Sequence, residues 1–146
     1  MQLTSEIKLP ENPQGKVVGF YLDLPPMGKQ RARVCTSSKG KSYSTYKQDY
    51  IDWMEAATFD LRNQWHNHGF THPLDSVQKI IVLNYGTRAS VDSDNLEGSV
   101  LDAMVKAGII RNDNVKVCPH TEQVWQRCKK GEPPHIEVIM ILPVEI

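Results

Sequence analysis

The strongest constraint on the fold is a stripe of apolar residues between position 46 and about position 66. Apolar side chains recur there at steps of three and four residues, namely Tyr46, Tyr50, Trp53, Met54, Ala57, Leu61 and Trp65. This spacing places them on one face of an amphipathic helix. Such a helix has to bury its apolar face against another element, so its neighbours in the chain decide the fold class.

Four apolar or alternating runs around this helix predict β-strands. They cover residues 16–24, 77–85, about 115–127 and 135–142, and the last two are expected to pair as a hairpin. A second helix is predicted from about Asp94 or Asn95 to Lys106, with Gly108 as its C-terminal cap. The order strand, helix, strand, helix, strand, strand favours an α+β fold: a single mixed β-sheet of about four strands with two main helices.

One domain is expected over residues 1–146, with 1–15 as an irregular lead-in. The apolar runs are too short for a transmembrane helix. Residues 1–8 lack the hydrophobic stretch of a signal peptide, so a cytoplasmic location is expected. The 17 basic and 17 acidic residues give a formal net charge of zero. This argues against binding nucleic acid by bulk charge alone, but it is compatible with charges that are sorted into separate patches.

A histidine cluster raises the hypothesis of a zinc protein. His66, His68 and His72 could supply imidazole ligands, but no Cys-x-x-Cys or second His pair completes the four ligands of a structural zinc site. We interpret the segment as a loop with solvated histidines and keep a His/Cys zinc protein as an alternative. In a chain without an export signal, three cysteines are expected to be reduced and mostly buried: Cys35, Cys118 and Cys128.

Acidic residues gather where the second strand leads into the second helix. Asp92 and Asp94 are two residues apart, so in an extended chain their carboxylates point to the same side. Two adjacent carboxylates are best tolerated around a divalent cation or near helix N-terminal amides. Asp113 could join them only if the chain turns back after the helix. Three carboxylates favour Mg²⁺ or Mn²⁺, whereas the alternative is an ordinary helix N-cap with solvated acids.

A basic segment complements these acids. No acid occurs between Asp23 and Asp49, and residues 27–45, rich in Gly, Ser and Lys, are predicted to form a long loop. Cations and small residues suit a phosphate backbone, and tyrosines can stack on opened bases. A solvated, mobile loop is the alternative. An acidic site beside a basic loop is what metal-assisted attack on a phosphodiester requires. The cations of this segment are Lys29, Arg31, Arg33, Lys39, Lys41 and Lys47.

Two motifs of the chain resemble the RusA-type Holliday junction resolvases of bacteria, phages and prophages. Residues 92–113 are similar to the family pattern of Asp-x-Asp-Asn, then Leu-Asp-Ala-Leu, then a Gly and an Asp-Asp or Asn-Asp pair. Residues 24–33 are similar to its Pro-x-x-Gly-Lys-x-Arg-x-Arg element. With the elements around them, the motifs extend the resemblance over about residues 17–142, in the family's order.

The resemblance implies a single nuclease domain that acts as a homodimer, depends on Mg²⁺ and resolves four-way DNA junctions by paired symmetric incisions in recombination and repair. It places Asp92, Asp94 and Asp113 on the family's catalytic, metal-binding aspartates. The implied partners are branched DNA and a second copy of the chain, in a bacterial or phage-infected cell. A two-fold dimer suits a junction with two equivalent phosphates. The phosphate contacts that we expect are Lys29, Arg31, Arg33, Lys47 and Arg88.

One position departs from the family pattern. The family carries a lysine four residues after the second Asp of the motif, and this chain has Gly98. A cation there could stabilise charge on the phosphate, and we expect Lys29, Arg31 or Arg88 to be able to supply it from elsewhere. A glycine within a helix costs about 1 kcal/mol relative to alanine, which indicates that another group approaches closely. The alternative function is a catalytically weakened protein that binds junctions without cutting them.

Overall fold

The structure is a computed structural model of the chain, and it describes residues 15–30, 33–87 and 93–144. Within these ranges, the side chains of residues 33, 35, 43–45, 93 and 94 lie outside the description. The elements in chain order are β1 (Val17–Leu22), β2 (Arg33–Thr36), β3 (Ser42–Thr45), α1 (Gln48–Asn67), β4 (Lys79–Gly86), α2 (Ser93–Lys106), β5 (Thr121–Arg127) and β6 (His135–Ile141).

Four strands form one mixed sheet in the order β1-β6-β4-β5. β6 runs antiparallel to both of its neighbours, and Val138 lies opposite Phe20 on one side and Val82 on the other. β5 runs parallel to β4, with Val124 opposite Leu83. Because α2 connects these two parallel strands, β4, α2 and β5 form a β-α-β unit. The predicted α+β class, with a mixed four-stranded sheet and two helices, is confirmed.

Two predictions about the last strands are wrong. β5 and β6 do not pair as a hairpin, because β4 lies between β6 and β5 in the sheet. β5 also begins at Thr121 rather than near Val115, whose side chain is 82% exposed. The side-chain oxygen of Asn114 accepts hydrogen bonds from the backbone N–H groups of Lys116 and Val117. Asn side chains favour such turns, and this one prevents the strand from starting earlier.

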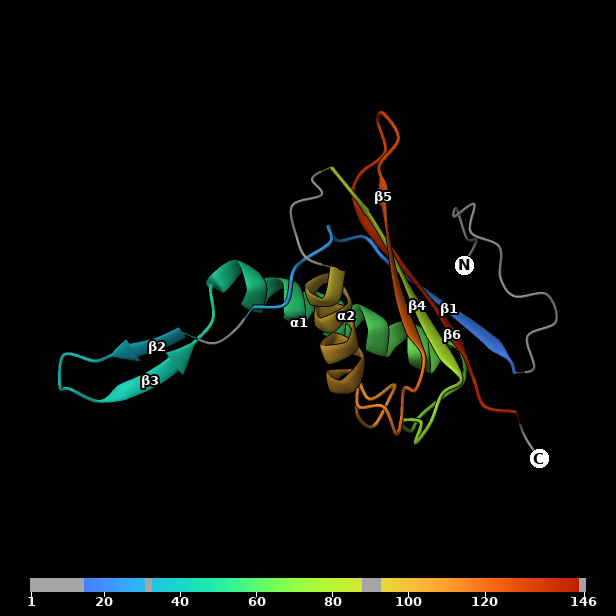
Figure 1. The fold of residues 1–146 in the computed structure, drawn as a ribbon, viewed down its shortest axis with the longest axis horizontal. Helices are drawn as coiled ribbons and strands as arrows, with labels where there is room; N and C mark the ends of the chain where they lie inside the picture. The colour runs from blue at the N-terminus through green and yellow to red at the C-terminus, as the bar shows by residue number, and fades with distance from the viewer. Residues whose placement is uncertain (1–14, 31–32, 88–92, 145–146) are drawn as a thin grey trace.

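The two helices lie on one face of the sheet (Figure 1). The stripe of α1 is buried from Tyr50 to Trp65 as predicted, whereas Tyr46 precedes the helix and is 43% exposed. The buried side of α2 joins that stripe and the inward faces of β1, β4 and β6 in one hydrophobic core. Neither helix in the described part of the chain has a stretch long and apolar enough to span a lipid bilayer.

Gly108 ends α2 as predicted. Its φ of 77° lies in the left-handed region, which glycine adopts without steric cost. The N–H groups of Gly108 and Ile109 donate to the carbonyls of Val105 and Met104, which are the paired bonds of a Schellman motif. The end of the helix is therefore fixed by its own backbone.

The segment predicted as a long loop contains a β-hairpin. β2 and β3 form a separate two-stranded sheet that projects from the body of the molecule (Figure 1). In the turn between them, the Gly40 N–H donates to the carbonyl of Ser37, and Gly40 has a φ of 78°. Sequence patterns miss these strands because each has only four residues and none of the alternating apolar pattern of a buried strand; Val34, for example, is 78% exposed.

Candidate active site

The acidic motif lies at the start of α2. The helix begins at Ser93, so Asp94 is its second residue, where the helix dipole favours negative charge. This start agrees with the predicted one within one or two residues. Asp92 and the side chain of Asp94 lie outside the described residues. Their joint binding of a metal ion therefore stays a prediction.

Asp113 lies beyond the other end of α2, in the loop that leads to β5. Its side chain is exposed, and its negative charge contributes to the raised pKa of Cys118. Burial, and then the negative charge of Asp113, raises the pKa of the Cys118 thiol to about 11. Because α2 has 14 residues, it rises about 20 Å between Asp94 and the start of this loop. That Asp113 binds the same metal ion as Asp92 and Asp94 therefore also stays a prediction.

The raised pKa makes Cys118 a slow nucleophile, since the thiolate is the reactive form of cysteine. We expect Cys118 to stay unmodified when the folded protein is treated with iodoacetamide at about pH 8, and to react once urea unfolds the chain. Peptide mass spectrometry measures this, with the less buried Cys128 as an internal comparison. Labelling of Cys118 in the folded protein at the rate of a free thiol would contradict its burial.

Lys29 lies against α2. Its backbone N–H donates to the carbonyl of Asn95 at 2.8 Å, and its Nζ is 3.3 Å from Oδ2 of Asp102. Between these two contacts its side chain passes over Gly98, where an added Cβ would be 3.0 Å from Lys29 Cδ. The first cation of the predicted basic loop is therefore attached to the helix that carries Asp94.

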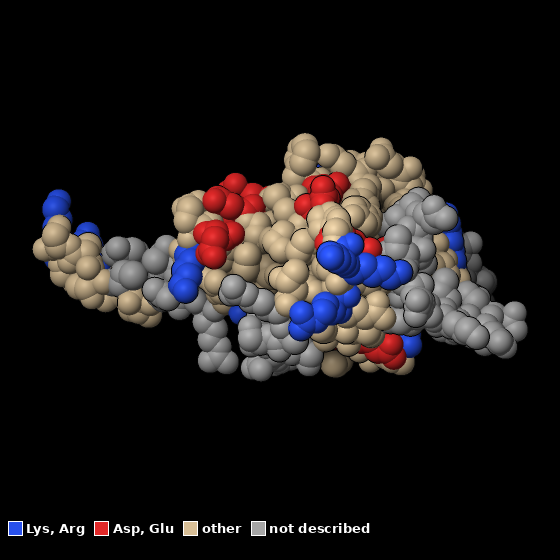
Figure 2. Space-filling model, turned by 90° about the horizontal axis from the view of Figure 1, so that it is seen from above, with Lys and Arg blue, Asp and Glu red and all other residues tan. Residues whose placement is uncertain are grey.

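The other predicted phosphate contacts are spread over different elements. Lys47 is exposed and immediately precedes α1, at the base of the hairpin. Lys39 and Lys41 are exposed at the hairpin tip, and Figure 2 shows blue side chains there and a second group of Lys and Arg over the body of the molecule. Three predicted contacts cannot be placed, because the residues or their side chains lie outside the described part of the chain: Arg31, Arg33 and Arg88.

The three histidines do not form a metal site with one another. His68 Nε2 lies 2.9 Å from the carbonyl oxygen of Gly19, and its ring meets the Phe20 ring edge-on. His66 and His72 are exposed. Over the described residues, no group of three His, Cys, Asp or Glu side chains is placed to hold a metal ion. The structure therefore gives no support to a zinc site built on this segment.

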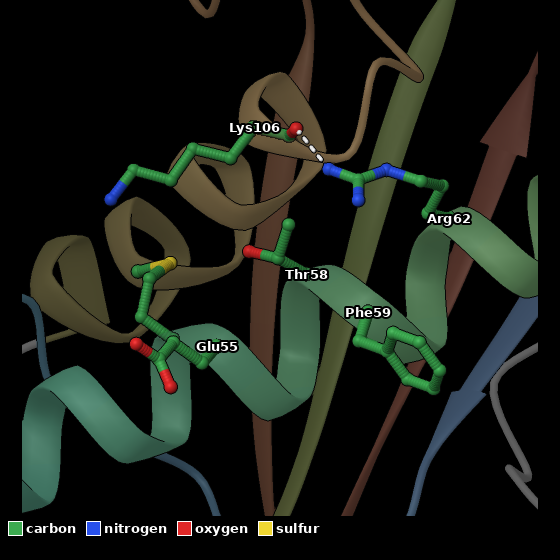
Figure 3. Close-up of a pocket in the computed structure, with 6 residues that line it drawn as sticks. Glu55, Thr58, Phe59, Arg62 and Lys106 are labelled. Carbon is green, nitrogen blue, oxygen red and sulfur yellow. Dashed lines mark hydrogen bonds between the residues drawn. The ribbon is translucent and has the colours of Figure 1, made fainter.

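A hollow of about 360 Å³ lies between α1 and α2 (Figure 3). Arg62 donates from Nη2 to the carbonyl oxygen of Lys106 at 3.0 Å, which satisfies one of the free carbonyls at the end of α2. Among the described residues that line it, Glu55 is the one carboxylate, so these residues do not supply the several oxygen ligands that a divalent ion requires. No sequence motif pointed to this hollow, because its residues belong to two ordinary amphipathic helices.

The comparison with known families decides what kind of protein this is. Residues 23–141 match the family described as Endodeoxyribonuclease RusA. The chain belongs to the RusA family. It is also 31% identical over 115 residues to the "Crossover junction endodeoxyribonuclease RusA" of Aquifex aeolicus, an alignment that covers 78% of this chain and 86% of that protein. Membership of the RusA family identifies the chain as an endodeoxyribonuclease.

Among solved structures, the fold has a distant similarity to the protein Atu1372 of Agrobacterium tumefaciens, whose function is unknown. The TM-score is 0.42 and the identity 12%, over 99% of this chain and 88% of that one. A structural similarity this low supports no conclusion about the function of the chain. Membership of the RusA family rests on sequence, and both motifs of the resemblance, residues 24–33 and 92–113, fall within the matched range.

Proposed function

We propose that this chain is a structure-selective endonuclease that resolves four-way DNA junctions with a divalent metal ion. The observation that carries the proposal is the RusA family match over residues 23–141. The Aquifex relative, which is called a crossover junction endodeoxyribonuclease, supports a branched DNA substrate.

The metal ligands in this proposal are Asp92, Asp94 and Asp113. Carboxylates are the hard oxygen donors that Mg²⁺ prefers, and Mn²⁺ accepts them as well. Asp113 fits such an ion, because its carboxylate is an exposed oxygen donor. A divalent ion held by these carboxylates would supply a hydroxide nucleophile and would polarise the phosphoryl oxygen.

The basic residues bind and orient the DNA in this proposal. Lys29, in the loop bonded to α2, and Lys47, at the base of the hairpin, lie on different segments, and in this proposal they contact separate phosphates and fix the orientation of the substrate. Arg31, Arg33 and Arg88 add further contacts. The zero net charge limits sequence-independent binding along duplex DNA, which favours selection by shape.

The active form that we propose is a homodimer. A four-way junction has two equivalent phosphates related by a two-fold axis, and a two-fold dimer would present one site to each. Paired symmetric incisions follow from that geometry. This activity belongs to DNA recombination and repair in the cytoplasm of a bacterial or phage-infected cell.

The test of the proposal is the cleavage of a synthetic four-way junction. We expect nicks at two symmetric positions with Mg²⁺ or Mn²⁺, none in EDTA, and cutting of a linear duplex of the same sequence at least about 100-fold slower. Denaturing gels measure the nicks, and native gels in EDTA measure binding. Equal cutting of junction and duplex would contradict structure selectivity.

The second candidate function has an outcome of its own in the same assay. Because Gly98 stands where the family carries a lysine, the chain could retain junction binding with weakened catalysis. Stable retention of the junction on a native gel, without nicks under any divalent cation, would favour this candidate over the nuclease.

A further inference from the structure

The segment that carries Lys29 is attached to the first two turns of α2. The Lys29 N–H donates to the carbonyl of Asn95 at 2.8 Å. The hydroxyl of Ser99, a fully buried residue, donates to the carbonyl of Met27. These two bonds join a loop after β1 to a helix that is distant in the sequence, so the backbone of Lys29 has a defined position on α2.

The side chain of Lys29 occupies the space above Gly98. A Cβ built on that glycine would lie 3.0 Å from Cδ of Lys29, 3.6 Å from its Cβ and 3.9 Å from its Cγ. The first of these distances is shorter than an ordinary carbon contact, so any larger residue at position 98 would push the lysine away. This close approach gives a physical reason for a glycine within the helix, where glycine is otherwise less favourable than alanine.

The ammonium of Lys29 is paired with Asp102, but weakly. Nζ lies 3.3 Å from Oδ2, and the two side chains are 45% and 27% exposed. A pair this open to solvent contributes little to stability, so a phosphate can compete for the ammonium. Positions 94, 98 and 102 are four residues apart and lie on the same face of α2. Lys29 therefore keeps a positive charge on the helix face that begins at Asp94.

We propose that Lys29 is the cation of the α2 site: its ammonium leaves Asp102 and binds a phosphate oxygen of the DNA beside the start of α2, where its own backbone is bonded to Asn95, and Gly98 leaves room for its stem along the helix surface. Asp102 is its partner in the free protein. The inference rests on the proposed function, because the phosphate belongs to the bound junction. Once there, the ammonium stabilises the negative charge that builds up on the phosphoryl oxygens.

The proposal is tested by removing the charge and then moving it. Lys29→Met keeps the apolar stem and removes the ammonium, and we expect single-turnover junction cleavage to fall about 100-fold. Lys29→Ala/Gly98→Lys places a lysine on the helix itself in the space that the truncation opens, and we expect it to cut at least about ten-fold faster than Lys29→Ala. The control is Lys130→Met in the exposed β5–β6 turn, which should stay within about two-fold of wild type.

A second measurement separates this inference from the proposed function. The slope of log affinity against log salt, taken for junction binding in EDTA, should become shallower by about 0.9 in Lys29→Met and return to the wild-type value in Lys29→Ala/Gly98→Lys.

If wild-type protein binds junctions without cutting, the nuclease proposal fails and this slope alone decides the role of Lys29. If wild-type protein cuts and Lys29→Met matches it in rate and slope, the inference is overturned while the function stands. A slower Lys29→Met with an unchanged slope and no rescue by the double variant would show a purely structural residue and also overturn it.

Discussion

Asp94→Asn is expected to abolish junction cleavage and to leave junction binding intact or tighter. The amide keeps the size of the carboxylate but loses the charge that would hold a divalent ion, and the repulsion of DNA phosphates decreases with it. Loss of the several kcal/mol that a metal ion contributes predicts at least about a 10³-fold fall in single-turnover rate. Denaturing gels with Mg²⁺ measure the rate, and native gels in EDTA measure the affinity.

Asp49→Asn is the matched control. Asp49 is the second residue of α1, as Asp94 is of α2, and its Oδ1 accepts the N–H of Tyr50. The variant removes a carboxylate from the same helical position, so it measures the loss of the helix-dipole interaction alone, about 0.3–1 kcal/mol of stability. Its cleavage rate should stay within about two-fold of wild type. Cleavage by Asp94→Asn as fast as by Asp49→Asn would remove Asp94 from the metal site.

The helices could be predicted because their pattern is local. The stripe from Tyr50 to Trp65 and the cap at Gly108 can be predicted from residues that are close together in the sequence, and the structure confirms both. Strand pairing cannot be predicted in this way, because it joins segments that can be far apart in the sequence. β6 is buried at every position, as expected for a strand covered on both faces, and this places it in the middle of the sheet between β1 and β4. Adjacency in the chain suggested a β5–β6 hairpin, whereas the burial of β6 on both faces is known only from the structure.

The candidate site also combines features that the local sequence predicts with contacts that it does not predict. The position of Asp94 at a helix start follows from the sequence, since the strand, the acidic motif and the helical stripe are consecutive. The cost of a glycine at position 98 indicated a close neighbour, and the structure identifies that neighbour as Lys29. No periodicity could name it, because the contact joins residues that are far apart in the chain. Side-chain contacts between distant segments depend on the sheet order, which the sequence pattern did not determine.

Trp65→Ala is expected to lower the free energy of unfolding by about 3–5 kcal/mol. The Trp65 side chain is 1% exposed, and its ring stacks on Phe70 with 4.0 Å between centroids and lies 6.3 Å from Phe20. Its Nε1 also donates to the carbonyl of His72 at 3.3 Å. Truncation leaves a cavity where α1, β1 and the loop after α1 meet. Domains of this size are stable by about 5–15 kcal/mol, so the loss is a large share of the total.

Trp65→Phe is the control that separates packing from the hydrogen bond. It keeps an aromatic ring against Phe70 and loses the Nε1 donor, so we expect a smaller cost of about 1–2 kcal/mol. Urea unfolding followed by circular dichroism measures both variants. Because Trp65 lies on the buried face of α1 and not on α2, cleavage per folded molecule should stay within about two-fold of wild type. A loss below about 1 kcal/mol in Trp65→Ala would contradict the packing of α1 against β1, since cavities of this kind cost more.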